Sequence, residues 1–187
     1  MQDEFQKQYR WITGLLKRPI SDFFKVDSLE YAILIRIKNE WGKRDTTELL
    51  TELKTKYGNT ALWAVDKFLE LNITRDWVEV GKKEAHEGTE IEDFIRILWE
   101  PLKEQGFEFT IKREGKTATF CVTKCPIYEL AKEIGMHEWL YHLACLTDFY
   151  STPAFSSKIG FSRTKTLIQG DGCCNHRYYY KRENKAQ

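Results

Sequence analysis

The sequence predicts an α+β protein, in which a helical half is followed by an antiparallel sheet of two hairpins with helices inserted between them and packed on one face. Two observations predict this class. Apolar residues recur every three or four positions in residues 1–105, and they alternate in short stretches after residue 106. We expect a single domain over residues 1–187, with a mainly helical part (1–105), a hairpin-helix-helix-hairpin part (106–181) and a frayed tail (182–187).

Two short helices with capping signals are predicted first. Asp27 or Ser28 can cap a helix that reaches position 41. Asp45 and Glu48 have the spacing of a capping box for the next helix, which should end before Gly58 because glycine favours the left-handed turn after a helix.

Two more helices complete the first half. One follows position 59, and another starts at the capping signature of Thr89 and Glu92. Pro101 should end or kink the second of these, because its ring removes a backbone donor and restricts the residue before it. The residues expected to face inward are Leu62, Val65, Phe68 and Leu69 in one helix and Ile91, Phe94, Ile95, Leu98 and Trp99 in the other.

The second half should contain two hairpins with helices between them. Residues 107–112 and 116–122 alternate around Glu114-Gly115, a plausible hairpin turn. Pro126 suits the first turn of a helix ending at Gly135, and residues 137–150 predict another helix before a loop at 151–157. Residues 158–168 and 173–180 are strand-like on either side of the turn signal Gln-Gly-Asp-Gly at 169–172.

The charge balance argues against a polyanionic partner. Charged residues make up 30% of the chain, and 29 Lys and Arg residues stand against 28 Asp and Glu residues, for a net charge of +1. Affinity for nucleic acid or an anionic membrane depends on excess positive charge, so we expect no nucleic acid and no membrane partner. A small-molecule substrate or ligand is what the family resemblance described below implies. Composition predicts no oligomeric state.

The five cysteines all lie at or after position 121. The N-terminal sequence has no apolar core typical of an export signal, and no apolar run approaches the ~18 residues of a membrane span, so we expect a cytoplasmic protein with reduced thiols. An odd number of cysteines cannot all pair within the chain. Free thiols, thiolate chemistry and metal ligation are the alternatives, beside simple packing as small hydrophobic residues.

Four motifs bring these thiols near other reactive groups. Cys125 precedes a predicted helix, where backbone N–H groups should lower the pKa of a thiol. Cys145 and Asp148 have i, i+3 spacing on a predicted helix. Asp171 precedes the adjacent pair Cys173 and Cys174 at the mouth of a hairpin, and His176 should share a face with Cys174, leaving Cys173 on the other.

Each of these residues also has a structural interpretation. Cys121 and Cys145 suit core packing, since free cysteine is among the most buried residue types. Asp171 between glycines is ordinary turn chemistry. Of the adjacent pair, only one thiol is expected to face a core or pocket.

The C-terminal motif Arg163-Thr-Lys-Thr-Leu-Ile-Gln-Gly-Asp-Gly-Cys-Cys-Asn-His-Arg-Tyr178 resembles the L-2-amino-thiazoline-4-carboxylic acid hydrolase family. Cys125-Pro126 and the Cys145…Asp148 pair are similar to that family's Cys-Pro and Cys…Asp elements, so the resemblance covers about residues 90–180. The chain departs from the family at Asn175-His176, where an acidic residue followed by an aromatic one is expected. A looser similarity is to 4-vinyl reductase-type small-molecule-binding domains.

The resemblance implies a hydrolase that opens the C=N bond of a small cyclic amidine, such as 2-amino-thiazoline-4-carboxylate, to an N-carbamoyl product. The residues we expect to carry it are Cys125, Asp148 and Cys174, then Cys173, His176 and Asp171. Arg163, Lys165 and Arg177 are candidates for binding the substrate carboxylate. Attack by a thiolate, water activation by a carboxylate and a metal-bound water are all open, with no cofactor predicted and a metal ion as the lesser alternative. The alternative function is a non-catalytic ligand-binding or sensor module.

Overall fold

The computed structural model describes residues 10–182 and confirms the α+β class, with helices throughout the first half and a four-stranded antiparallel sheet in the second. Two compact units divide the chain. Unit 1 comprises residues up to Asn72 together with Leu130–Leu146, and unit 2 comprises Ile73–Glu129 and the residues from Thr147 onward. Most of the predicted frayed tail, and the first nine residues of the predicted helical part, lie outside the described residues.

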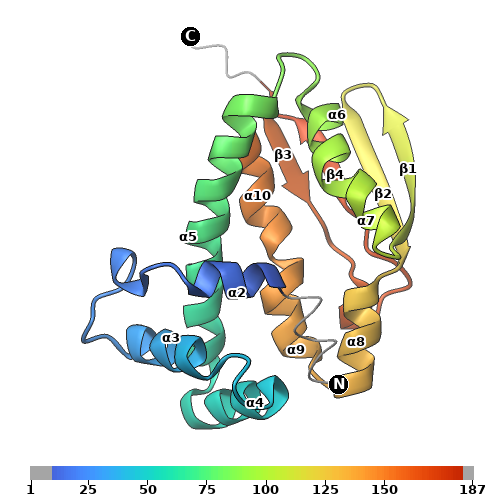
Figure 1. Ribbon diagram of the computed structural model, residues 1–187. Coiled ribbons are helices and arrows are strands. Elements are labelled where there is room, and N and C mark those ends of the chain that lie inside the picture. Colours follow the sequence, from blue (N-terminus) through green and yellow to red (C-terminus); the bar gives the residue numbers. More distant parts are fainter. Residues whose placement is uncertain (1–9, 183–187) are drawn as a thin grey trace. The chain divides into compact units, whose positions relative to one another are not determined.

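Unit 1 is helical (Figure 1). Its core is formed by leucine, isoleucine and phenylalanine side chains such as Leu34, Leu50 and Phe68. Its elements are α2 (Arg10–Leu16), η1 (Ile20–Asp22), α3 (Leu29–Glu40), α4 (Thr46–Tyr57), the first part of α5 (Asn59–Glu84), the end of α8 (Pro126–Ile134), α9 (His137–Leu140) and the π-helical turn η3 (Tyr141–Cys145).

The predicted caps of α3 and α4 are confirmed. Ser28 Oγ accepts the Tyr31 N–H at 3.1 Å, and Asp45 Oδ1 accepts the Glu48 N–H at 2.9 Å. Each bond satisfies a backbone donor that has no partner inside its helix. Gly58 follows α4 with a positive φ of 58°, a conformation that glycine adopts without steric cost.

Unit 2 is built on a sheet with strand order β1-β2-β4-β3. The strands are β1 (Glu108–Glu114), β2 (Thr117–Lys124), β3 (Ile159–Ser162) and β4 (Arg177–Tyr180). The first hairpin has the expected turn, with Glu114 paired to Thr117. β2 joins the two hairpins by pairing with β4, where Ala118 lies opposite Tyr178.

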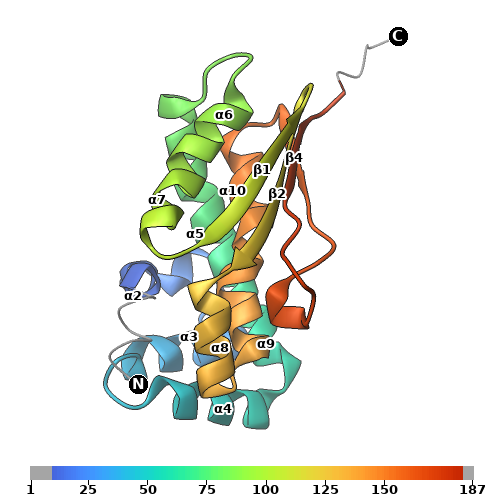
Figure 2. The ribbon, with the colours of Figure 1, turned by 90° about the vertical axis from the view of Figure 1, so that its right-hand side faces the viewer.

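Helices cover one face of this sheet in Figures 1 and 2. They are the second part of α5, α6 (Glu90–Phe94), the π-helical turn η2 (Ile95–Trp99), α7 (Glu100–Glu104) and α10 (Thr147–Phe155). Aromatic side chains fill the space between helices and sheet, and Phe94, Phe120 and Tyr178 are fully buried there. This aromatic core forms one side of the candidate site.

Three details differ from the sequence predictions. Of the two outcomes predicted for Pro101, the ended helix is wrong, because the chain continues through the π-helical turn η2, where the Glu100 N–H donates to the Ile95 carbonyl five residues back. Thr89 makes no side-chain cap bond, since its hydroxyl contacts Asp93 instead. The predicted loop at 151–157 is mostly the end of α10, which contains Pro153.

The second hairpin is also shorter than predicted. β3 ends at Ser162 and β4 begins at Arg177, so residues 163–176 form a long connection. Within it, Leu167–Gln169 is a 3₁₀ turn (η4), and Cys174 makes an isolated bridge to Val122 of β2. The N–H groups of residues 164–166 donate to the side chains of Asn175 and Asp171, and those of residues 169–171 donate to backbone carbonyls of the same connection.

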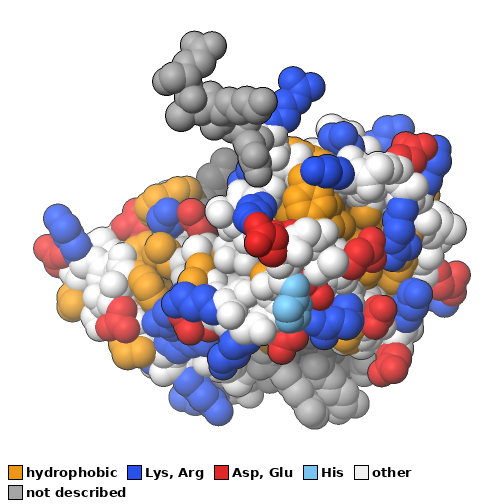
Figure 3. All heavy atoms as spheres, turned by 90° about the horizontal axis from the view of Figure 1, so that it is seen from above, with side chains coloured by type: hydrophobic (Ala, Val, Ile, Leu, Met, Phe, Trp, Pro, Cys, Tyr) orange, Lys and Arg blue, Asp and Glu red, His pale blue; other side chains and the backbone are white. Residues whose placement is uncertain are grey.

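Two further features concern the surface. Among the described helices, none is both long enough and apolar enough to cross a membrane. On the described part of the face shown in Figure 3, Lys and Arg side chains alternate with Asp and Glu side chains.

Candidate functional site

Asp148, Arg163 and His176 form a buried polar cluster in unit 2. Arg163 Nη1 donates to Asp148 Oδ2 at 2.9 Å, and His176 Nε2 lies 3.2 Å from the same oxygen. The Arg163 and His176 side chains are 3% and 7% exposed, whereas that of Asp148 is 16% exposed. The cluster therefore reaches solvent mainly through its carboxylate.

Separate elements bring these three groups together. Asp148 lies in the first turn of α10, Arg163 follows β3, and His176 precedes β4. The backbone of His176 is held by the Phe120 N–H of β2, which donates to the His176 carbonyl at 2.7 Å. A helix and two strands therefore hold the three side chains of the cluster in place.

Aromatic rings pack against the cluster and lower the polarity around it. Trp99 packs edge-on against the His176 ring with centroids 4.9 Å apart, and its Nε1 donates to the Tyr178 hydroxyl at 3.0 Å. The Arg163 guanidinium lies over the rings of Phe149 and Phe161, at 5.4 and 5.9 Å. Low polarity strengthens the charge interactions among Asp148, Arg163 and His176.

The second ring nitrogen of His176 is the least satisfied atom of this site. His176 Nδ1 is buried and has no hydrogen-bond partner among the described residues. The Thr152 hydroxyl on α10, one helical turn after Asp148, is likewise buried without a partner. Buried polar atoms are almost always hydrogen-bonded, so two unpaired ones in unit 2 suggest that a water or ligand is bound there.

Cys174 lies close enough to this cluster for its pKa to respond to it. The Leu167 N–H donates to Cys174 Sγ at 3.2 Å. Burial raises the pKa of the thiol, while Arg163 lowers it and Asp148 raises it. Cys174 and His176 are buried and Cys173 is half-buried, which agrees with the predicted alternation of faces.

The prediction of a lowered pKa at Cys125 was wrong. The N–H groups of Ile127 and Tyr128 at the start of α8 bond to this sulfur and act in the expected direction. Burial outweighs them and raises the pKa of Cys125 to about 11, with small further contributions from Cys174 and Asp148. Cys125 is therefore a neutral thiol near the cluster.

Asp171 and Asn175 hold the 163–176 connection in shape. Asp171 Oδ2 accepts the Thr166 N–H at 2.7 Å, and Asn175 Oδ1 accepts the N–H groups of Thr164 and Lys165 at 3.0 and 2.7 Å. Asp171 thus bonds to the connection itself, and the connection positions Cys174 and His176.

The other predicted site residues lie apart from the cluster or in unit 1. Arg177 is exposed, and its guanidinium lies 5.0 Å from the centroid of the Tyr179 ring, on the opposite strand face to Tyr178. Lys165 is exposed on the connection. Cys145 belongs to unit 1, where it ends the π-helical turn η3.

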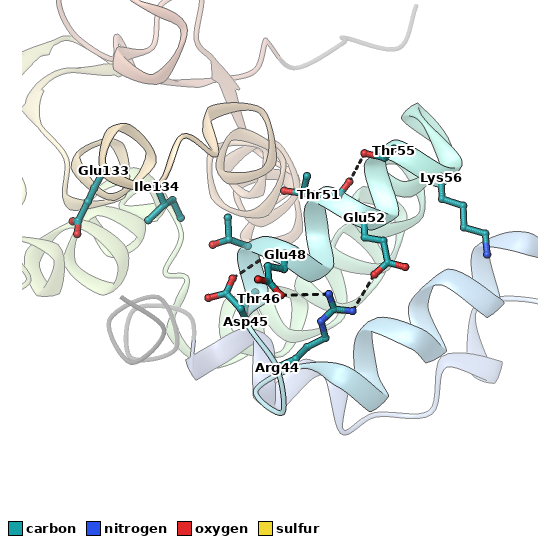
Figure 4. A pocket seen from close by; sticks show the side chains of 11 residues that line it. Arg44, Asp45, Thr46, Glu48, Thr51, Glu52, Thr55, Lys56, Glu133 and Ile134 are labelled. Atoms are coloured by element: carbon teal, nitrogen blue, oxygen red, sulfur yellow. Dashed lines mark hydrogen bonds and ion pairs between the residues drawn. The ribbon is translucent and has the colours of Figure 1, made fainter.

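A groove of about 910 Å³ lies in unit 1, and Figure 4 shows its lining. Several of its charged side chains are already engaged, since Arg44 contacts Glu48 and Glu52 and Asp45 caps α4. The groove contains neither a thiol nor a histidine. Across residues 10–182, no group of three or more His, Cys, Asp or Glu side chains is placed to hold a metal ion.

Sequence reasoning missed the role of Trp99, Thr152 and Tyr178. The sequence predicts Trp99 as a core residue and Tyr178 as part of a strand. Nothing in it indicates the hydrogen bond between the Trp99 indole and the Tyr178 hydroxyl. Thr152 lies at i+4 from Asp148 on α10, but the sequence predicted a loop there, so this shared helix face was not a usable signal.

The sequence of the chain matches the model of a known protein family. A model of the L-2-amino-thiazoline-4-carboxylic acid hydrolase family matches residues 38–178, well over half of the chain. The chain belongs to this family. No match was found among the curated proteins.

The hydrolase family match is wider than the sequence motifs indicated. It begins at residue 38, in α3 of unit 1, and ends at Tyr178 in β4. Every residue of the Asp148 cluster, together with Cys125 and Cys174, lies inside the matched region. The unusual Asn175-His176 pair now has a structural account, in which Asn175 anchors the connection and His176 enters the cluster.

Proposed function

We propose that the protein hydrolyses a small cyclic amidine such as 2-amino-thiazoline-4-carboxylate to an N-carbamoyl product, with Asp148 and His176 activating the water. The observation that carries this proposal is the buried Asp148–His176 contact of 3.2 Å, with the unpaired His176 Nδ1 on the other side of the ring. Membership of the hydrolase family supports the reaction class.

In this proposal His176 is the general base. With Nε2–H donating to Asp148, the lone pair of Nδ1 is available to take a proton from water, and the carboxylate stabilises the imidazolium that forms. Arg163 holds the shared Asp148 oxygen in place at 2.9 Å. The water oxygen bonds to the amidine carbon as its proton moves to His176.

Collapse of the resulting intermediate breaks the bond between that carbon and the ring sulfur. One proton goes to the ring nitrogen and one to the leaving sulfur, which accounts for both hydrogens of the water and gives an N-carbamoyl cysteine. The imidazolium of His176 returns its proton to the leaving sulfur, so the base is regenerated. The raised pKa values of Cys125 and Cys174 argue against a resting thiolate nucleophile. Cys174 contributes by accepting the Leu167 N–H, which holds the connection that carries His176.

The test is ring opening of 2-amino-thiazoline-4-carboxylate by the purified full chain, followed by the appearance of a free thiol and of the N-carbamoyl product. We expect turnover by the wild type and by Cys145→Ser, with reduced turnover by Cys174→Ser. Absence of turnover on this and related cyclic amidines at high enzyme concentration would exclude the proposed reaction.

A further inference from the structure

Cys121 and Cys173 meet on the face of the sheet that lies away from the aromatic core. Val122 and Cys174 exchange two backbone hydrogen bonds of 3.0 Å, and Phe120 N–H donates to the His176 carbonyl at 2.7 Å. Phe120, Val122, Cys174 and His176 all point inward and are buried. Alternate residues of a strand point to opposite faces, so Cys121 and Cys173 point outward.

The two outward thiols are in direct contact. Cys121 and Cys173 are diagonal neighbours on one face beside the Val122–Cys174 bridge, and their side chains share a hydrogen bond. Both side chains are half-buried, whereas Cys125 and Cys174 are buried. A soluble oxidant can therefore reach this pair before it reaches the thiols in the core.

We propose that Cys121 and Cys173 are a redox-sensitive pair that closes to a disulfide when the protein meets hydrogen peroxide. One thiolate attacks a peroxide oxygen and the O–O bond breaks, which leaves a sulfenic acid and one molecule of water. The second thiol then attacks the sulfenic sulfur and a second water leaves. Two thiols are oxidised by two electrons in total, and one peroxide is reduced to two waters.

The neighbouring pair Cys173 and Cys174 is the competing site. Adjacent residues of an extended chain point to opposite faces, so a bridge between them would need the backbone to leave its present conformation. A bridge between Cys121 and Cys173 keeps the Val122–Cys174 hydrogen bonds. It would also tie the 163–176 connection, which carries His176, to β2.

The test is titration of the full chain with hydrogen peroxide, followed by thiol counting under denaturing conditions and peptide mapping without reduction. We expect the loss of two of the five thiols and one cross-linked peptide pair that contains Cys121 and Cys173. Cys121→Ser should lose the cross-link, and Cys145→Ser should retain it.

Cys174→Ser separates the two possible bridges. The proposal predicts that this variant still forms the cross-link between Cys121 and Cys173. A cross-link between Cys173 and Cys174 in the wild type would overturn the proposal, as would equal oxidation of all five thiols without a bridge. Because the readout is a mass and not turnover, the result does not depend on the proposed hydrolase reaction.

Discussion

At Cys125 two local effects act on one thiol in opposite directions. The start of α8 supplies N–H donors that favour the thiolate, and the surrounding core favours the thiol. Burial is the larger effect, so position at a helix start did not predict the state of the group. The sequence shows the helix start clearly, but it does not show how closely the core surrounds the sulfur.

This balance predicts a pH dependence of stability. The folded state holds the Cys125 proton up to about pH 11, above the value of 9.0 for an exposed thiol. This stabilisation of the folded state is complete below the pKa of the unfolded thiol, and it is lost as pH rises through the pKa of the folded one. The difference in unfolding free energy between wild type and Cys125→Ser should shrink by about 2–3 kcal/mol from neutral to strongly alkaline pH. Urea unfolding of both proteins at several pH values measures this difference. A difference that stays constant with pH would contradict the account.

Asp148 is predicted to matter for stability as well as chemistry. Asp148→Asn leaves the buried Arg163 guanidinium without its carboxylate, which should cost about 3–5 kcal/mol. The matched control is Glu92→Gln, which breaks the exposed ion pair with Arg113 and should cost less than about 1 kcal/mol. Equal effects of the two substitutions in urea unfolding would show that the cluster is not tightly held.

At the scale of elements, the caps of α3 and α4 and the helix ends before Gly58 and Gly135 were predictable, whereas the effect of the prolines was not. Ser28 and Asp45 act through bonds to residues three positions away, so the sequence contains the whole interaction. Pro101 and Pro153 both lie within helical segments, and at Pro101 the π-helical turn η2 comes directly before the proline. Nothing in the sequence signals this turn.

Packing of α5 against α10 within unit 2 gives a prediction at this scale. A Cβ atom added at Gly81 would lie 1.9 Å from the Phe155 carbonyl oxygen, so the two helix backbones must separate in Gly81→Ala. We expect a loss of about 1–3 kcal/mol in thermal or urea unfolding. Gly14→Ala in α2 is the control, since its Cβ would meet nothing within 4 Å, and it should be neutral or stabilising. A tolerated Gly81→Ala would contradict the close approach.

For the whole molecule, periodicity predicted the class and the order of hairpins and helices. It did not predict the division into two units, because the boundaries fall inside α5 and α8 and leave no linker signal in the sequence. The candidate site was predictable as a set of residue types near the C-terminus. Its assembly was not, since the partners Asp148, Arg163 and His176 meet only when the 163–176 connection folds back on the sheet.

The central claim is that His176 and Asp148 activate water for ring opening. The most direct measurement is kcat for 2-amino-thiazoline-4-carboxylate in His176→Gln, with Arg177→Gln as the neighbouring control on the outer face. General base catalysis contributes about 10²–10⁴-fold, so kcat should fall by about that factor in His176→Gln and stay within a few-fold of wild type in Arg177→Gln. A folded His176→Gln protein with wild-type kcat would contradict the account.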